Sequence, residues 1–292
     1  MKRYISFATS GRFGNAVFEY IATRVIQHYL NCINPEIQYE YKWMYHITYT
    51  KYNDVYSDKS HPDVDIHERD FFTVYNIIKS GINPFEQSER GHIYLNGWFQ
   101  FDTHILENRD LIRSWFSLTN TDHISQSIRV CDLVQVVQLV KEGRKEVPFT
   151  EQDVVVHVRL DDFKMNGHDS IIIHSKSYIE LFQTIEQKNG ETRFVLICDK
   201  VKHSFEQEYM KQLLQSEFEI VPVIGNHMFV DFAMMCCAKR LVCSNSTFSW
   251  IAMLFGDNTE NWFPELQGEF PNQQIERLDR KSQLYKYKFL KW

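Results

Sequence analysis

Short apolar runs alternate with amphipathic stretches through the second half of the chain. Runs rich in Val, Ile and Leu are typical of strands buried on both faces, and the stretches between them carry the 3.6-residue period of helices. This alternation predicts right-handed crossovers and a parallel sheet of the Rossmann type. The expected strands are residues 154–158, 194–198, 219–223 and 241–243, and the expected helices are residues 178–188, 204–216, 228–239 and 249–255.

The first half begins with the same pattern and then loses it. An apolar run at residues 4–8 and a helical period at residues 16–30 flank a break at Gly11 and Gly14, as at the start of an α/β layer. Residues 39–70 show neither period, which predicts a surface excursion. The remaining elements expected here are a helix at 71–79, a short strand around Tyr94, an amphipathic stretch ending at residues 115–116 and a helix at 132–140.

A polar stretch that contains Gly143 and Pro148 precedes the strongest apolar run. Glycine and proline between periodic segments mark loops and domain boundaries. We therefore predict two domains, residues 1–147 and residues 148–292. With 292 residues, the chain is long enough for each domain to bury its own core.

Composition and charge narrow the function. Hydrophobic residues make up 43% of the chain and charged residues 24%, which is typical of globular proteins. The formal net charge of -6 gives no footprint for non-specific nucleic-acid binding, so an anionic ligand must be held by local groups. No apolar stretch approaches the roughly 18 residues of a membrane span, and the run at residues 4–8 is too short for a signal peptide. We therefore expect a cytoplasmic protein.

Arg159 follows the strongest predicted strand within the segment His-Val-Arg-Leu-Asp-Asp-Phe at residues 157–163. In a doubly wound sheet this is the edge that faces the ligand, where a guanidinium can donate two hydrogen bonds to a diphosphate. The alternative is an arginine that only pairs with Asp161 or Asp162.

A polar turn leads from the last predicted strand into a helix, with the sequence Ser-Asn-Ser-Thr-Phe-Ser-Trp at residues 244–250. Amides at a helix N-terminus and the hydroxyls of Ser246 and Thr247 favour a phosphate. The alternative is ordinary N-capping. Asp231, after residues 227–229, would by itself be a helix-start carboxylate.

Other polar groups give weaker signals. Gly11-Arg12-Phe13-Gly14-Asn15 matches neither the P-loop nor the dinucleotide fingerprint. An Asp-x-Asp metal motif at residues 63–65 lies in a polar stretch, and no two histidines have the His-x-x-x-His spacing of ligands. The six cysteines lack Cys-x-x-Cys spacing and are expected to be mostly buried thiols. We expect no metal site.

Taken together, four segments resemble motifs of the α1,2-fucosyltransferases (glycosyltransferase family eleven) and, more distantly, of the protein O-fucosyltransferases. Residues 11–15 resemble an amino-terminal Gly-x-x-Gly-Asn motif, and Asn-Gly-Trp-Phe-Gln at 96–100 resembles an aromatic Gly-Tyr-x-Gln stretch. Residues 157–163 resemble a His-x-Arg-x-Gly-Asp-Tyr motif, and residues 244–250 an Asn-Ser-Ser-Phe-Ser-Trp turn. The four occur in the family's order.

The resemblance implies a GT-B-like α/β fold, in which two Rossmann-type domains face a cleft. It implies inverting transfer of fucose from GDP-β-L-fucose to a glycan, at the 2-hydroxyl of a terminal galactose, without metal or other cofactor. The first domain would lie on the acceptor side and the second would bind the donor. Arg159 would bind the diphosphate and act in catalysis, and the other implied donor contacts are His157 at the nucleotide or bracing Arg159, Asp231 at guanine, Ser246 and Thr247 at phosphate, and Asn15 and Arg12 from the first domain.

Two positions depart from the family pattern. Asp161 stands where glycine is usual, which puts bulk and negative charge next to a diphosphate site, and Ala16 stands where glutamine is usual. The catalytic base stays open among Glu19, Asp161 and Asp162. The alternative functions are a transferase for another nucleotide sugar and an inactive protein that binds nucleotide sugar or glycan.

Overall fold

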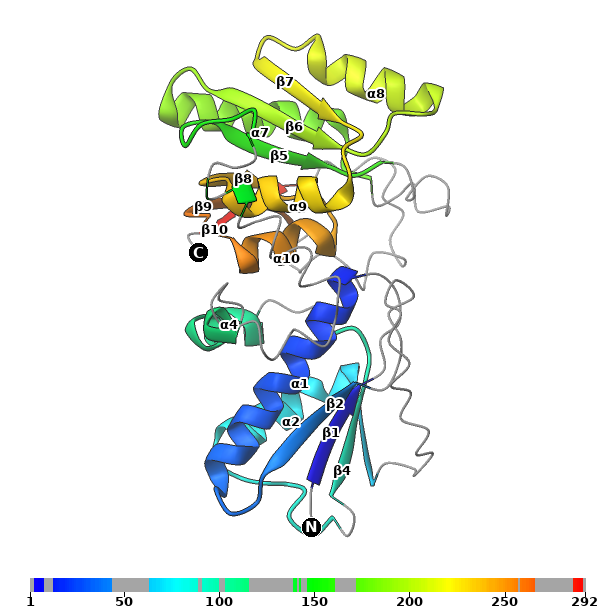
Figure 1. Ribbon diagram of the computed structural model, residues 1–292, viewed down its shortest axis with the longest axis vertical. Helices are drawn as coiled ribbons and strands as arrows, with labels where there is room; N and C mark the ends of the chain where they lie inside the picture. Colours follow the sequence, from blue (N-terminus) through cyan, green and yellow to red (C-terminus); the bar gives the residue numbers. More distant parts are fainter. Residues whose placement is uncertain are drawn as a thin grey trace. The chain divides into compact units, whose positions relative to one another are not determined.

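The computed structural model shows an α/β protein that divides into two compact units, Met1–Trp115 and Phe116–Trp292 (Figure 1). The predicted boundary between residues 147 and 148 falls later in the chain and stays a prediction. The structure describes residues 3–7, 13–43, 63–88, 91–99, 103–115, 139–140, 142, 146–160, 172–256, 258–265 and 286–290.

The first unit is built on a four-stranded parallel sheet with the strand order β2-β1-β4-β3. The chain goes from β1 to the neighbouring β2 and then crosses to the far edge, so the strand order reverses between β1 and β4. The strands are β1 (Arg3–Phe7), β2 (Tyr39–Trp43), β3 (Val64–His67) and β4 (His92–Asn96), and the helices are α1 (Phe13–Ile33), a 3-10 turn (Glu68–Asp70), α2 (Phe71–Lys79), α3 (Thr103–Glu107) and α4 (Arg109–Trp115).

The predicted surface excursion at residues 39–70 is wrong where the structure describes it. Tyr39–Trp43 pairs with β1 and Val64–His67 pairs with β4, so both segments are edge strands. In β3 only Ile66 is buried, and the side chains of Asp65 and His67, which point to the opposite face, are exposed. The helix at 71–79 is confirmed. Of the helix predicted at 132–140, only residues 139–140 are described.

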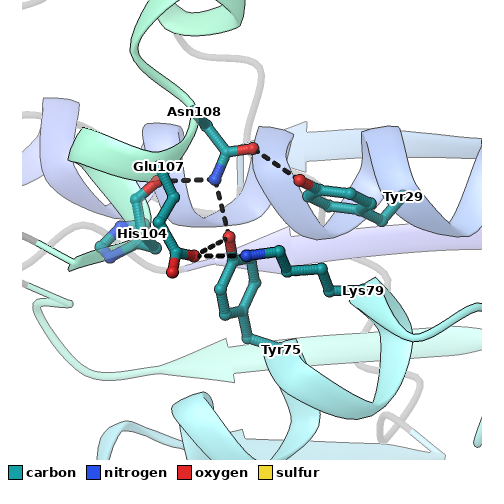
Figure 2. Close-up of polar contacts among 6 residues, drawn as sticks. All are labelled: Tyr29, Tyr75, Lys79, His104, Glu107 and Asn108. Atoms are coloured by element: carbon teal, nitrogen blue, oxygen red, sulfur yellow. Dashed lines mark hydrogen bonds and ion pairs between the residues drawn. The ribbon is translucent and has the colours of Figure 1, made fainter.

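A hydrogen-bond network ties α3 and the following turn to α1 and α2 (Figure 2). The Asn108 amide accepts from the Tyr29 hydroxyl at 2.9 Å and donates to the Tyr75 hydroxyl at 2.9 Å. Glu107 accepts from Tyr75 at 2.7 Å and from Lys79 at 2.9 Å. Next to them, burial lowers the pKa of His104 to about 3, so its imidazole is neutral. The network fixes where the chain goes after β4.

The second unit is a six-stranded sheet with the order β10-β9-β8-β5-β6-β7, parallel except for β10. The alternating elements predicted from the sequence are confirmed, with ends that shift by a few residues, whereas β9 and β10 were not predicted. The strands are β5 (Val154–Val158), β6 (Arg193–Cys198), β7 (Glu219–Ile224), β8 (Arg240–Val242), β9 (Glu260–Glu265) and β10 (Lys286–Leu290), and the helices are α7 (Ser175–Asn189), α8 (Ser204–Leu214), α9 (Met228–Cys237) and α10 (Thr247–Phe255).

Helices cover both faces of this sheet, which explains why the central strands are apolar throughout. Residues of α7 and α8 pack with Val154, Val156 and Val158 in one core, where the Phe182 and Phe194 rings stack at 4.1 Å. The helices α9 and α10 pack on each other, and the Phe248 ring of α10 lies 6.0 Å from the His157 ring. The unit is therefore doubly wound, as predicted for a Rossmann-type domain. The cleft expected between the domains stays a prediction.

None of the helices within the described ranges combines the length and apolar character that crossing a bilayer requires.

Candidate functional site

The strand order of the second unit reverses between β5 and β8, and the polar motifs follow these two strands. The chain leaves β5 toward β6 on one side, whereas the strand after β8 lies on the other side. Open α/β sheets bind ligands at such a point, outside the carboxyl ends of the strands. The structure thus brings together two segments that lie more than eighty residues apart in the sequence.

His157 connects the ends of the two strands. Its Nδ1 atom and the Ser244 hydroxyl are 2.7 Å apart, and both side chains are buried. On the other face of the sheet, the Tyr178 hydroxyl of α7 donates to the His157 carbonyl at 3.0 Å. His157 therefore holds the end of β5 to the turn after β8. Arg159, two residues further along the chain, extends from this fixed backbone.

Arg159 pairs with Asp199, a residue that the sequence analysis did not single out. The Arg159 Nη1 atom lies 3.2 Å from Asp199 Oδ2, and the Arg159 side chain is 14% exposed. Asp199 directly follows β6, the neighbour of β5, so both residues emerge at the same edge of the sheet. The alternative partners considered for Arg159, Asp161 and Asp162, lie outside the described residues.

The turn after β8 starts α10 at Thr247, two residues earlier than the sequence predicted. Ser246 is the N-cap: its hydroxyl accepts a hydrogen bond from the Phe248 amide at 3.3 Å. Capping uses the acceptor capacity of the hydroxyl and leaves its proton available as a donor. The alternative considered for this turn, ordinary N-capping, is therefore observed at Ser246. It is compatible with a phosphate at the positive end of the helix, and the phosphate contact stays a prediction.

Asp231 lies in the first turn of α9, which follows β7, and it is 5% exposed. Burial raises its pKa to about 7; the hydrogen bond from the Asn226 amide, at 3.2 Å, opposes the rise, and the negative charge of Asp199 adds to it. A carboxyl group that titrates near neutral pH is uncommon outside functional sites. Asp199 therefore faces Arg159 on one side and acts on Asp231 on the other.

The buried Cys198 thiol reports how close these charges are. Burial raises its pKa to about 12, the charges of Asp199, Glu206 and Asp231 add to the rise, and Arg159 lowers it. Arg159 and Asp199, which follow β5 and β6, thus act on this thiol together with Glu206 of α8 and Asp231 of α9. Cys198, Cys236 and Cys243 are buried thiols, in agreement with a structural role.

In the first unit, two of the resembling segments follow β1 and β4, the strands at which its order reverses. Asn15 lies in the first turn of α1, the helix that follows β1 in the chain, and its side chain is half-buried. Arg12 and Gln100 lie outside the described residues, whereas residues 96–99 end β4 and begin the next turn. Both units therefore carry their motifs at the reversal of the strand order.

The Asp-x-Asp motif lies in a strand, contrary to the sequence analysis. Asp65 belongs to β3 and Asp63 precedes it, at the amino end of the strand rather than at the ligand edge. The Asp63 carboxylate accepts hydrogen bonds from the Ser88 hydroxyl and from the His92 amide. In the ranges that the structure describes, no three His, Cys, Asp or Glu side chains are grouped as metal ligands would be. Glu19, one candidate base, is fully buried in α1.

Comparison with known proteins gives one curated relative by sequence. It is an alpha-1,2-colitosyltransferase of Escherichia coli, 22% identical over 167 residues, which are 56% of this chain and 51% of the relative. The chain therefore spans about half the length of the curated relative that it matches. No protein family model matches the chain.

Among solved structures, a crystal structure of POFUT1 in complex with GDP superposes with a TM-score of 0.40 and 12% identity, over 87% of this chain and 95% of the other. POFUT1 in complex with GDP-fucose superposes with a TM-score of 0.41 and 13% identity, over 92% and 96%. At these scores the superposition assigns no residue of the site. The sequence similarity is to a glycosyltransferase, a colitosyltransferase, and acceptor and linkage lie beyond it.

The position of Asp199 between Arg159 and Asp231 leads to a prediction. Replacing Asp199 by Asn removes a negative charge that disfavours ionisation of Asp231, so the pKa of Asp231 should fall below 7. Carbon-13 NMR of the Asp carboxyl groups across pH 4–9 measures this. The control is Glu208→Gln, which removes an exposed carboxylate of α8 that pairs with Lys211. An unchanged midpoint in Asp199→Asn would contradict the assigned electrostatic contact.

Proposed function

We propose that the protein is a glycosyltransferase that moves fucose from GDP-β-L-fucose to a glycan hydroxyl with inversion, at the 2-hydroxyl of a terminal galactose. The observation that carries the proposal is the grouping of Arg159, the α10 N-terminus and Asp231 at one edge of a doubly wound sheet. The similarity to a colitosyltransferase supports the transferase class. We assign residues 148–292 to the donor and residues 1–147 to the acceptor.

The proposed mechanism depends on charge that develops on the departing GDP. An oxocarbenium-like transition state leaves negative charge on the diphosphate, and fixed donors directed at that charge lower the barrier. Arg159 supplies a guanidinium, and the α10 N-terminus supplies amides together with the hydroxyls of Ser246 and Thr247. Because these protein groups neutralise the charge, the proposed reaction uses no metal and no other cofactor.

Asp199 gives Arg159 a partner while the donor is absent. An arginine buried to this extent is costly without a counter-charge, and the Asp199 carboxylate provides one at 3.2 Å. A diphosphate also offers negatively charged oxygens, two of which can accept from the planar guanidinium at once. Donor binding would therefore exchange one anion for another at Arg159, with His157 holding the end of β5 in place.

A second candidate is transfer of another sugar from a nucleotide donor, because the curated relative is named for colitose rather than fucose. Groups that bind diphosphate and base do not contact the transferred sugar. The features of the site that we assign to GDP therefore serve either sugar equally.

Mass spectrometry of the purified protein with GDP-fucose and galactose-ended glycans tests the proposal. We expect fucose to be added to a β-galactoside, and we expect GDP, but not UDP, to raise the melting temperature, because only ligands of the native state stabilise it. Transfer from GDP-colitose alone would select the second candidate. A rise with GDP without any transfer would indicate an inactive binding protein, and a rise with UDP alone would refute the donor assignment.

Arg159→Lys should reduce kcat even though the charge is kept. Lys presents one compact ammonium where the guanidinium presents a planar fork, and removal of one donor to developing charge typically costs on the order of 100-fold to 1,000-fold. Arg159→Ala should be nearly inactive. Arg193→Lys is the matched control: Arg193 pairs with Asp153 at the other end of the sheet, so its variant should change the melting temperature and keep kcat. A folded Arg159→Ala protein with near-normal kcat would remove Arg159 from the site.

Binding of GDP-fucose should weaken as the pH falls below about 7. The ionised Asp231 carboxylate can accept from the ring N–H and the exocyclic amine of guanine, and its pKa without ligand is about 7. Each unit of pH below this value then weakens the affinity by up to about tenfold, until the lower pKa of the complex is reached. Calorimetry from pH 5.5 to 8.5 measures the effect. Asp231→Asn should bind more weakly, with a flat profile; affinity that increases at low pH would mean that the neutral carboxyl binds the base.

A further inference from the structure

The turn after β4 has an unusual backbone at two positions, Gly97 and Phe99. Phe99 has a φ of 51°, and it is the non-glycine residue with a positive φ among those the structure describes. This left-handed conformation is rare for a bulky side chain and is strained. Gly97, two residues earlier, has a φ of 153°, where glycine is favoured. Such strain persists only where neighbouring groups impose it.

Glu68 imposes the conformation of this turn. Its Oε2 accepts from the Trp98 amide at 3.3 Å and its Oε1 from the Phe99 amide at 3.1 Å. A Cβ atom on Gly97 would come within 2.5 Å of the Glu68 Cβ, so the glycine allows the two segments to approach. Burial raises the pKa of Glu68, although the hydrogen bonds from the Trp98 and Phe99 amides oppose the rise.

The two neighbouring aromatic side chains of this turn have different surroundings. Phe99 is fully buried and packs on Phe71 of α2, with ring centroids 5.1 Å apart. Trp98 is 42% exposed. The left-handed Phe99 and the two Glu68 hydrogen bonds therefore fix the backbone of a turn in which Trp98 lies at the surface.

Polar side chains are exposed at the edge of the sheet where β4 leads into the Trp98 turn. Asn96 at the end of β4 pairs in register with His67 at the end of β3, and both side chains are exposed. β4 is also one of the two strands at which the order reverses. An exposed aromatic face at an edge that also carries amide and imidazole groups matches a pyranose ring, which has an apolar C–H face and hydroxyls at its rim.

We propose that Trp98 is the stacking platform for a pyranose ring of the carbohydrate acceptor, and that Glu68 is the positioning residue that holds the Trp98–Phe99 turn in its presenting conformation. That the bound carbohydrate is the acceptor of a transfer rests on the function proposed above, whereas binding of the carbohydrate does not. The Glu68 carboxylate acts through the two amides and does not itself contact the sugar.

NMR with methyl β-galactoside and the full chain, without donor, tests the proposal. The chain has six tryptophans, and the indole N–H signal that disappears in Trp98→Phe identifies Trp98. We expect this signal to shift on titration, with saturable binding that Trp98→Ala weakens about tenfold or more and Trp98→Phe largely retains. The matched control is Ile82→Ala, which removes a 59% exposed apolar side chain from the same unit and should leave the affinity unchanged.

A double-mutant cycle separates positioning by Glu68 from a general effect on stability. Glu68→Ala should weaken binding about as much as Trp98→Ala does, and the double variant should be no weaker than Trp98→Ala alone, because Glu68 acts only through Trp98. Glu68→Gln, which keeps one carbonyl acceptor, should lie between wild type and Glu68→Ala. Additive losses would overturn the positioning role.

The remaining outcomes distinguish this inference from the proposed function. Absence of binding, or binding that Trp98→Ala leaves unchanged, would overturn the platform. GDP should raise the melting temperature of wild type, Trp98→Ala and Glu68→Ala by the same amount, since neither variant removes a group that we assign to the donor. If GDP has no effect while methyl β-galactoside binds through Trp98, the donor assignment fails and the carbohydrate site stands.

Discussion

The hydrogen bond between the His157 ring and the Ser244 hydroxyl is the contact on which the rest of the candidate site depends. The two side chains join the ends of two parallel strands at 2.7 Å, and both are buried. Parallel strands are linked along their length by backbone bonds, but their ends are not, and here a side-chain bond continues the link. Arg159 and the start of α10 then diverge from one fixed place, and the Tyr178 hydroxyl secures the same backbone from the opposite face.

Around this place the protein balances charge rather than concentrating it. Arg159 has Asp199 beside it, and the same Asp199 raises the pKa of Asp231, so one carboxylate is coupled to both. A cationic site without such a counter-charge would be costly to bury. The net charge of -6 makes this local arrangement necessary, because the chain as a whole does not attract an anionic ligand.

The sequence was most informative where strands are buried on both faces. The run Val-Val-Val-His-Val stands out because no position in β5 faces solvent, and the residues after it could be placed at a sheet edge from topology alone. The edge strand Val64–His67 has four residues, of which only Ile66 is buried, and so short a pattern was missed. Asp199 could have been found by the reasoning applied to Arg159, since it directly follows a buried strand. Glu68 could not, because its role is set by two amides thirty residues away.

The two units use the same topological position for different chemistry. In each, the resembling segments follow the strands at which the sheet order reverses. In the second unit this edge carries a guanidinium, capped helix amides and a carboxyl group with a raised pKa, which suit a charged nucleotide. In the first unit it carries an exposed indole in a strained turn, and the exposed amide and imidazole groups of Asn96 and His67 lie at the same edge, which suits a neutral ring. A parallel sheet brings the carboxyl ends of its strands to one edge. The residue types placed there, rather than the fold, determine what each unit can bind.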